Sequence, residues 1–533
     1  MKDRVEKISA KISYILDKYN LLFLLMIFLV FLFSRLYMLG VIPAGIHYDG
    51  VSMAFDAKTL AKYGMDRWGN RFPFYLPAFG DGQSPLYTYT MALLIRFVPF
   101  SMVVMRLPAV IYGCVCFFSM YFLVRDAFED KRWALMGPVL VTIIPYFFTS
   151  ERWALDCNLF LSLAPLAFYM LFRAIRDDKK LTWFLSGLAI GITLYTYVLS
   201  YVVIPVFLAL ALIYVIAIKR FSFKGWLIMA IPVFVLALPL LLMQLISMGL
   251  IEPFSFLIFD FPRLYYYRSG EISLSHIPGN LWYLWGILVH GKSFTFTSIP
   301  KFGPIYVVMI PFVAAGFAIS VINTVKAIRT KSFAVEPLML AFTIGGYFMM
   351  MMTSGDLNIY NGNELFIMFA MYIIICMKWL HDKAKLITPA VLLVFAAYFL
   401  SFSNYYFRHY NAEFGLQFMF ISTEHMDVVN YVNNNLNPGH KKIYYMYDVH
   451  QLLYEDTVIG CALAPDPRNW RKDLDEKNMI NNVYIGTPAE GFDMDEDCIY
   501  IMARDGNGHI IPYFIEDGWT YDESFPSYTI LYR

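Results

Sequence analysis

Long apolar runs recur through the first 400 residues, and they constrain the fold of this chain more than any other feature. Hydrophobic residues make up 59% of its 533 residues and charged residues 16%, whereas a soluble domain carries about 25% charge. The sequence therefore predicts an all-α polytopic membrane bundle. Eleven runs are long enough to cross a hydrocarbon layer of about 30 Å as helices: 21–40, 102–124, 133–150, 156–174, 182–199, 201–218, 225–246, 303–323, 336–353, 364–380 and 386–402.

A twelfth run, 86–99, is too short for a span and contains Arg96. Its length favours an interfacial or re-entrant helix. With this run outside the count, the Lys- and Arg-rich loops all fall on the side of the N-terminus: RDAFEDKR, RAIRDDKK, KRFSFK, KAIRTK and KWLHDKAK. Because positive loops stay in the cytoplasm, we expect the N-terminus inside and the C-terminus outside the cell membrane.

This topology places every sizeable loop on the extracytoplasmic face. The loops are 41–101 and 247–302, and both belong to a membrane domain predicted for residues 1–402. Residues 403–533 predict a small extracytoplasmic α/β domain, with a helix at STEHMDVVNYVNNNL and strands at KKIYYMYDVH, NNVYIG, DCIYIMAR and YTILYR. In this domain Cys461 and Cys498 are candidates for a disulfide, although sequence alone does not pair them.

Several motifs lie in a characteristic order along the membrane region. They are the first loop from HYDG to SPLYTY, MRLPAVIYG at 105–113, SERWALDCNLF at 150–160 and SIPKFGPIYVVMIPF at 298–312. In this order the chain resembles bacterial members of the polyprenyl-phosphate-sugar-dependent GT-C glycosyltransferases, the membrane enzymes similar to protein O-mannosyltransferases and to the aminoarabinose transferase of lipid A. The resemblance implies inverting transfer of one sugar from a polyprenyl phosphate to an acceptor hydroxyl on the outer face.

Such a transfer needs a general base, because the acceptor hydroxyl loses its proton as it attacks the anomeric carbon. Asp49 in PAGIHYDG is the first candidate, since it lies just beyond the first apolar run. Asp156 in ERWALDCN is the second, and it is expected on the same face. Its alternative role is to cap the helix that follows.

The leaving group is a lipid phosphate, which calls for cations or a metal. The candidate phosphate-binding residues in the outer loops are Arg152, Arg263, Arg268 and Lys292. Each of them can instead bind lipid head groups or form a local ion pair.

The chain departs from its relatives at three places. Gly50 stands where many have a second acid, and Gln83 where many have a lysine. The segment GDLNIYNGNELF lacks a basic residue that is often present. Three alternatives follow: another basic residue substitutes, a divalent cation is held by Asp49, Asp156 or Glu364, or this member is not catalytic. No metal-ligand spacing supports a particular cation site.

Two classes of function are excluded or disfavoured. The net charge of +1 gives no basic character for nucleic acid, and no Walker motif supports an ATP-driven pump. A transporter or lipid flippase remains the competing hypothesis, but transporters place ionisable residues near the bilayer midplane, where these spans have few. The expected partners are the polyprenyl-phosphate sugar, membrane lipid and an acceptor that is a glycan of the cell envelope, a lipid or a protein.

Overall fold

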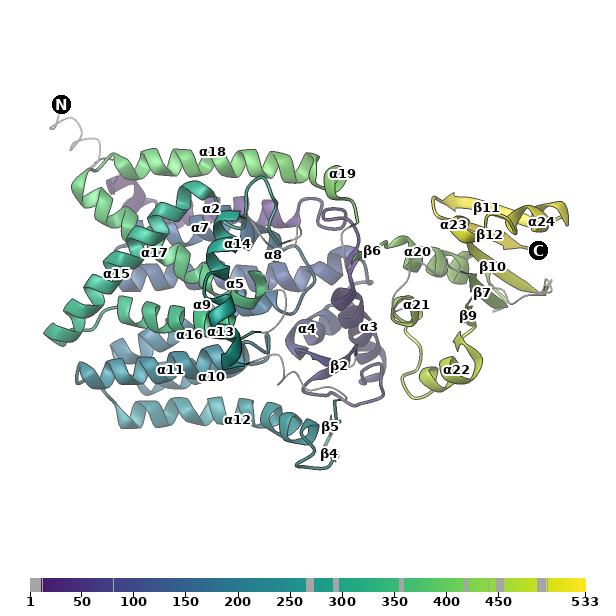
Figure 1. Cartoon of the computed structure of the whole chain (residues 1–533), viewed down its shortest axis with the longest axis horizontal. Coiled ribbons are helices and arrows are strands. Elements are labelled where there is room, and N and C mark those ends of the chain that lie inside the picture. Colours follow the sequence, from purple (N-terminus) through teal and green to yellow (C-terminus); the bar gives the residue numbers. More distant parts are fainter. Residues whose placement is uncertain are drawn as a thin grey trace.

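The computed structural model describes residues 11, 13–79, 81–264, 273–290, 297–353, 359–416, 420–439, 441–446, 455–486, 495 and 497–533. The molecule is elongated, with a bundle of long helices and a smaller domain attached to one end of it (Figure 1). The C-terminus of the chain lies in the smaller domain.

Each predicted span corresponds to one helical segment of the bundle, and successive segments run back and forth along it (Figure 1). Seven helices in the described part of the chain are long and apolar enough to cross a membrane. The segments are α2 (Asn20–Leu36), α5 (Met102–Phe128), α6 to α8 (Lys131–Ala134, Met136–Ile143, Pro145–Ser150), α9 (Asn158–Asp177), α10 (Lys180–Thr193), α11 (Ser200–Ala217), α12 (Phe223–Ser247), α15 (Ile310–Thr330), α16 (Glu336–Met352), α17 (Leu365–Lys383) and α18 (Ile387–Arg408).

The third segment is broken where a single span was predicted at 133–150. Ile144 adopts an extended conformation, with φ −67° and ψ 127°, and Pro145 starts the next helix. A residue before proline is pushed out of the helical region by the proline ring, so the break follows from the sequence. The amide of Tyr146 donates to the carbonyl of Pro304, which repairs one hydrogen bond at the break.

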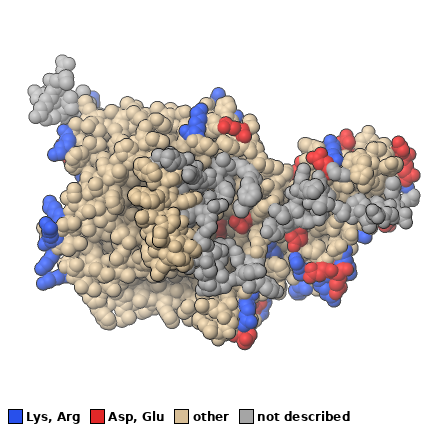
Figure 2. All heavy atoms as spheres, viewed as in Figure 1, with Lys and Arg blue, Asp and Glu red and all other residues tan. Residues whose placement is uncertain are grey.

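Burial divides the long helices into central and peripheral ones. The most apolar windows of α9 and α17 are 83% and 72% buried within the protein, against 22% for α12 and 11% for α18. The peripheral helices therefore turn apolar side chains outward, as a bilayer requires. Figure 2 shows a broad band of the visible face without charged side chains, and Lys and Arg gather at the end far from the smaller domain.

The first loop folds at the opposite end of the bundle, beside the smaller domain (Figure 1). Its elements are α3 (Tyr48–Tyr63), β2 (Leu76–Ala78), β3 (Asp81–Gln83) and α4 (Pro85–Ile95). At about 1.5 Å per residue, the 11 residues of α4 reach roughly half of a 30 Å hydrocarbon layer. The prediction that run 86–99 does not cross agrees with this length.

The C-terminal domain is built on a six-stranded mixed sheet, in the order β11-β12-β10-β7-β9-β8. β7 pairs in parallel with β9 and β10, and the other pairs are antiparallel. The strands are β7 (Lys442–Met446), β8 (Met479–Ile480), β9 (Val483–Ile485), β10 (Cys498–Ala503), β11 (Thr520–Phe525) and β12 (Tyr528–Tyr532), and the helices include α20 (Glu424–Tyr431), α21 (Glu455–Leu463), α22 (Trp470–Lys477) and α24 (Ile511–Glu516).

Two details of this domain go beyond what the sequence decided. α18 continues to Arg408, six residues beyond the predicted end of the last span, so the helix enters the region assigned to the domain. Cys461 and Cys498 are both free thiols. They belong to separate hydrophobic clusters, one shared with α3 and one formed with Phe514 and Trp519, so no disulfide joins them.

The C-terminal domain and the first loop share one hydrophobic core. The short strand β1 (Ile46–His47) pairs with β6 (Phe420–Ile421), and α21 packs on α3. Lys58 of α3 donates to the carbonyl of Ala462 at 2.9 Å, near the end of α21. Trp470 packs on Phe55 with ring centroids 5.2 Å apart. The first loop is therefore held between the bundle and the domain.

Candidate active site

Asp49 lies in the first turn of α3, with its side chain 41% exposed. The imidazole of His47 caps this helix, because its Nδ1 accepts the amide of Asp49 at 3.1 Å. Burial lowers the pKa of His47, although the Asp49 carboxylate 3.4 Å away opposes this shift. The ring is therefore a neutral cap, and the carboxylate of Asp49 faces an accessible space.

Asp156 lies just before α9 and is buried. Its Oδ1 accepts the amide of Cys157 at 2.8 Å, and its Oδ2 accepts the amide of Ser84 at 3.0 Å. The second bond ties the start of α4 in the first loop to the start of α9 in the bundle. Asp156 thus lies one position before the N-cap residue of α9, Cys157, and accepts the amide of that residue.

The dipeptide Gln83–Ser84 brings the two candidate acids together. Ser84 donates to Asp156 as described, and the Nε2 of Gln83 donates to the main-chain oxygen of Asp49 at 3.2 Å. Adjacent residues of one loop thus contact both acidic residues. The same dipeptide leads directly into Pro85, the first residue of α4.

A buried polar network continues from Gln83 into the first loop. Its Oε1 accepts from Ser52 at 2.7 Å, and Ser52 also accepts from the guanidinium of Arg67. Arg67 forms an ion pair with Asp56 at 3.0 Å and donates its amide to the same carboxylate at 2.9 Å. Asp56 and Arg67 are almost inaccessible to solvent, so the network fixes the first turns of α3.

Another buried acid, Asp66, lies beside the network that contains Asp56. It accepts the amides of Trp68 and Asn70, which shapes the turn after α3. Burial raises the pKa of Asp66 to about 7, and the nearby Asp56 adds to this effect. Sequence reasoning missed this set, although Ser52 and Asp56 are four residues apart and so share a helix face.

Gly50 is packed so closely that a side chain there would require its neighbours to shift. A Cβ at this position would lie 3.0 Å from the main-chain oxygen of Ala154 and 2.8 Å from the Cε of Met105. The glycine at position 50, where relatives have a second acid, therefore has a steric reason. Its lack of a side chain lets α3 pack closely against the segment that carries Asp156.

Two buried arginines hold the chain that leads into α3. Arg106 donates to the carbonyls of Leu39, Pro43 and Gly45 at 2.7 to 2.9 Å. The Nη atoms of Arg152 donate to four carbonyls, those of Ser34, Arg35, Tyr37 and Ile42.

Arg152 was predicted as a phosphate ligand, but its contacts give it another role. All four of its Nη hydrogens are used on main-chain carbonyls, and the side chain is fully buried. The residue closes the end of α2, where carbonyls lack helical partners. We therefore leave it out of the phosphate site.

The remaining predicted cations lie in or near loop 247–302. Arg263 is 43% exposed, donates to the carbonyl of Ile246 at 3.2 Å and pairs with Glu252 at 3.3 Å. Arg268 and Lys292 lie outside the described residues.

The alternative of a divalent cation finds no ligand set in the described part of the chain. No three His, Cys, Asp or Glu side chains gather there in a way that holds a metal ion. Glu364, one of the proposed ligands, is fully buried at the start of α17. Neither of its carboxyl oxygens has a hydrogen-bond partner.

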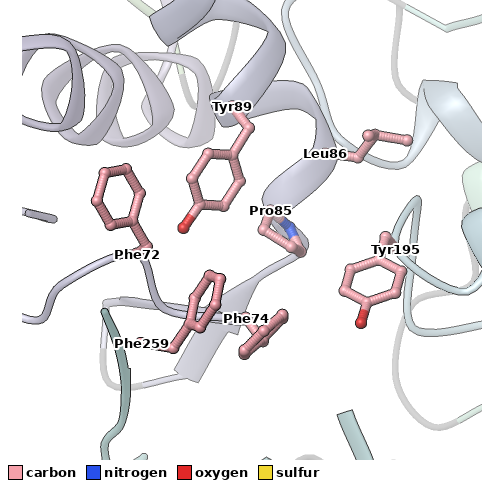
Figure 3. Close-up of a pocket in the computed structure, with 7 residues that line it drawn as sticks. All are labelled: Phe72, Phe74, Pro85, Leu86, Tyr89, Tyr195 and Phe259. Atoms are coloured by element: carbon pink, nitrogen blue, oxygen red, sulfur yellow. The ribbon is translucent and has the colours of Figure 1, made fainter. Parts of the chain in front are cut away.

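An apolar pocket of about 220 Å³ opens beside Ser84. Figure 3 shows its lining from the first loop, α4, the turn after α10 and loop 247–302: Phe72, Phe74, Pro85, Leu86, Tyr89, Tyr195 and Phe259. The hydroxyls of Tyr89 and Tyr195 donate to the carbonyls of Pro73 and Leu236, so both polar ends are satisfied. The pocket suits a hydrocarbon more than a sugar.

Comparison with known proteins adds to this description. Residues 82–243 match the family model described as dolichyl-phosphate-mannose-protein mannosyltransferase. The matched stretch includes Gln83, Ser84, Asp156 and four pocket residues, and Asp49 lies before it. No curated protein matches the chain by sequence.

Two solved structures of ArnT from Cupriavidus metallidurans have a similar fold. The one bound to undecaprenyl phosphate superposes with a TM-score of 0.59 at 12% identity, over 96% of this chain and 98% of that one. The apo form gives 0.56 at 11% identity, over 97% and 98%. The similarity covers the bundle and the C-terminal domain together. The predicted resemblance to the polyprenyl-phosphate-sugar-dependent GT-C glycosyltransferases is confirmed.

Proposed function

We propose that this chain, with its GT-C fold, transfers a sugar from a polyprenyl-phosphate donor to an acceptor hydroxyl, with inversion at the anomeric carbon. One observation carries the proposal. Gln83 and Ser84 bond the main chain of an accessible acid, Asp49, and the side chain of a buried one, Asp156, and the next residue, Pro85, lines an apolar pocket. A base beside a hydrocarbon site is what a lipid-borne sugar donor needs.

Asp49 is the general base in this proposal. Its carboxylate is accessible, so an acceptor hydroxyl can reach it and transfer its proton during attack on the sugar. The main chain of Asp49 is held by the His47 cap and by Gln83. Asp156 positions the loop, since both of its oxygens accept main-chain amides.

The apolar pocket takes the first part of the polyprenyl chain. Its lining has no unpaired hydroxyl, and ArnT, whose fold is similar, binds undecaprenyl phosphate. The phosphate then lies near the pocket mouth. Arg263 is the described candidate for the cation that binds this phosphate, because its guanidinium is partly exposed and, among the residues that the structure describes, bonds one carbonyl and one exposed carboxylate. Arg268 and Lys292 remain proposed ligands.

The orientation follows from the charge of the two ends. The loops opposite the C-terminal domain carry the Lys and Arg residues, as Figure 2 shows on one face. Under the positive-inside rule this end is cytoplasmic, so the site and the C-terminal domain face outward. The acceptor, whether glycan, lipid or protein, then approaches from outside the cell.

The test is transfer of radiolabelled sugar from a panel of polyprenyl-phosphate sugars by the purified chain in lipid vesicles. Asp49→Asn keeps the side-chain shape but removes the base, so we expect transfer to fall by about 10²-fold or more. Asp382→Asn is the matched control, since this carboxylate is 63% exposed at the other end of the bundle. The anomeric configuration of the product, read by NMR, tests inversion.

Three results would count against the proposal in different ways. Full activity of Asp49→Asn removes the base assignment. Donor binding without transfer, across acceptors of all three classes, favours the non-catalytic alternative. Passage of the donor lipid across vesicles without transfer would favour a flippase.

A further inference from the structure

The hairpin formed by β4 (Phe254–Phe256) and β5 (Phe259–Phe261) has an apolar tip that the proposed chemistry does not use. Phe256, Leu257 and Ile258 are 60%, 76% and 55% exposed. Leu257 has φ +56°, a conformation that glycine or asparagine adopts more easily and usually fills in hairpin loops. A large apolar residue therefore occupies a turn position where water-facing hairpins carry small or polar ones.

The base of the hairpin is fixed, so the tip has a defined position. The amide of Asp260 donates to the carbonyl of Arg71 at 2.9 Å, and the two side chains form an ion pair at 3.0 Å. Phe259 and Phe261 pack against Phe74, with ring centroids 4.9 and 5.3 Å away. Through Phe259 the hairpin also forms one wall of the apolar pocket.

The hairpin follows α12, a helix long and apolar enough to cross a membrane. The 25 residues of α12 span about 37 Å at 1.5 Å per residue, somewhat more than a hydrocarbon layer of about 30 Å. Lys219, Arg220 and Lys224 mark the other end of this helix. The last turn of α12 and the hairpin after it are therefore level with the opposite head groups, and Figure 1 shows the hairpin projecting from the bundle beside that end.

The apolar surface of α12 continues into the tip. Along the helix, exposed apolar side chains recur at Leu227, Ile231, Phe234, Leu238 and Leu241. Beyond it, Met248 and Leu250 are also exposed before the hairpin begins. In a membrane bundle this surface contacts lipid. Because the hairpin tip continues the surface, we expect the tip to contact lipid as well.

We propose that residues 256–258 insert into the leaflet next to the site, with bilayer lipid as the occupant of this surface. An apolar loop fixed at its base can enter the head-group and upper acyl region in the manner of an interfacial anchor. A further consequence rests on the proposed function: the hairpin wall places the pocket in contact with the leaflet. The polyprenyl donor then reaches the pocket from the bilayer, past the hairpin, and not from water.

The insertion is tested by site-directed spin labelling of the full chain in lipid vesicles. A nitroxide on Leu257→Cys is expected to be relaxed by oxygen, which concentrates in lipid, and shielded from a water-soluble nickel complex. The control is Tyr513→Cys, whose parent side chain is 63% exposed on the C-terminal domain and should show the opposite preference. The unmodified chain, labelled in parallel, measures the background from the native thiols.

Two readings would overturn the insertion. Nickel relaxation of the Leu257 label equal to that of the Tyr513 label places the tip in water. Shielding from both reagents places it against protein, either a second copy of the chain or another partner. Neither reading depends on sugar transfer, so the insertion and the proposed function can fail separately.

The route of the donor is tested by Leu257→Asp, which puts a charge at the tip. We expect the KM for a long polyprenyl-phosphate sugar to rise about tenfold, because the charged tip leaves the leaflet. The KM for a short-chain, water-soluble donor should not change. Tyr513→Asp is the matched control and should leave both values unchanged. An equal effect of Leu257→Asp on the KM of both donors would contradict entry of the donor from the bilayer. Insertion of the tip would still be decided by the spin-label measurement.

Discussion

At the scale of single residues, the site depends on short side chains that contact main chain. Asp49 is held through its amide and carbonyl, and Asp156 through two amides of neighbouring segments. The sequence named both acids because of their place at the ends of apolar runs. It did not show that Asp156 closes the loop, since that needs the amide of Ser84, 72 positions away.

The roles of the arginines were harder to predict from the sequence than those of the two acids. A buried arginine that caps carbonyls and one that binds phosphate look alike in a sequence. Arg152 proves to be the first kind, because the end of α2 needs donors. Asp56 and Arg67 were missed because a charged pair in an outer loop normally reads as solvated surface, whereas here α21 and α22 cover it.

Gln83→Lys tests whether the lysine of related enzymes can be restored. We expect no gain in transfer, since residue 83 is buried against Ser52 and its neighbour Arg67 already supplies a cation. The variant loses the bond from Ser52 and adds a like charge, which should cost about 1–3 kcal/mol of stability. Thermal unfolding and the transfer assay measure the two effects, with Gln83→Glu as the shape-matched variant. A Gln83→Lys chain with higher kcat and unchanged Tm would show that residue 83 faces the phosphate.

At the scale of elements, periodicity and run length were enough for the bundle and most of the sheet. All eleven spans have a helical segment, and β7, β9, β10 and β12 lie within the predicted strands. β11, with the sequence TYDESF, was missed because it is an exposed edge strand without an apolar face. The two residues of β8 are too few to give a pattern. Distant pairing, such as β1 with β6, has no local signal at all.

Trp470→Ala tests the contact between α22 and the first loop. The indole is buried, packs on Phe55 and donates its N–H to the carbonyl of Arg67. Removing it should destabilise the interface by about 3–5 kcal/mol, the usual effect of truncating a buried tryptophan. Hydrogen exchange should rise in α3 and α21 together. Tyr521→Ala, at an exposed position of β11, is the control, and equal exchange in both variants would contradict a shared core.

His425 in α20 gives the C-terminal domain a defined pH dependence. Its ring contacts the hydroxyls of Tyr445 and Tyr528 inside the domain, and burial lowers its pKa from 6.5 to about 4. The unfolded chain therefore binds more protons between these values, so stability falls as pH drops from 6.5 towards 4. The full loss is about 3 kcal/mol, at 1.36 kcal/mol per pKa unit.

The measurement for His425 is the thermal unfolding of the chain at pH 7.5 and pH 5. We expect a lower Tm at pH 5 and a smaller pH effect in His425→Asn, which keeps a polar group but cannot gain the charge. An unchanged difference between the two pH values in this variant would assign the dependence to other groups.

At the scale of the whole molecule, the charged loops and the C-terminal domain lie at opposite ends of an apolar band (Figure 2). This arrangement predicts the sidedness of labelling in intact cells. A membrane-impermeant maleimide should react with Tyr513→Cys in the C-terminal domain and not with Asp382→Cys at the other end. Disrupted cells should give both reactions. Labelling of Asp382→Cys alone in intact cells would show that the chain has the opposite orientation, with the C-terminal domain inside the cell.

The contact between the first loop and the C-terminal domain also sets the order in which the molecule is completed during synthesis. Arg67 and Trp470 are 403 positions apart, so at about 5–20 residues per second a ribosome adds the second roughly 20–80 s after the first. During that interval the Asp56–Arg67 pair lacks the cover that later removes it from water. The Asp56–Arg67 pair is therefore buried only when the C-terminal domain folds. A chain terminated before that domain would contain the helical bundle but would leave this pair exposed.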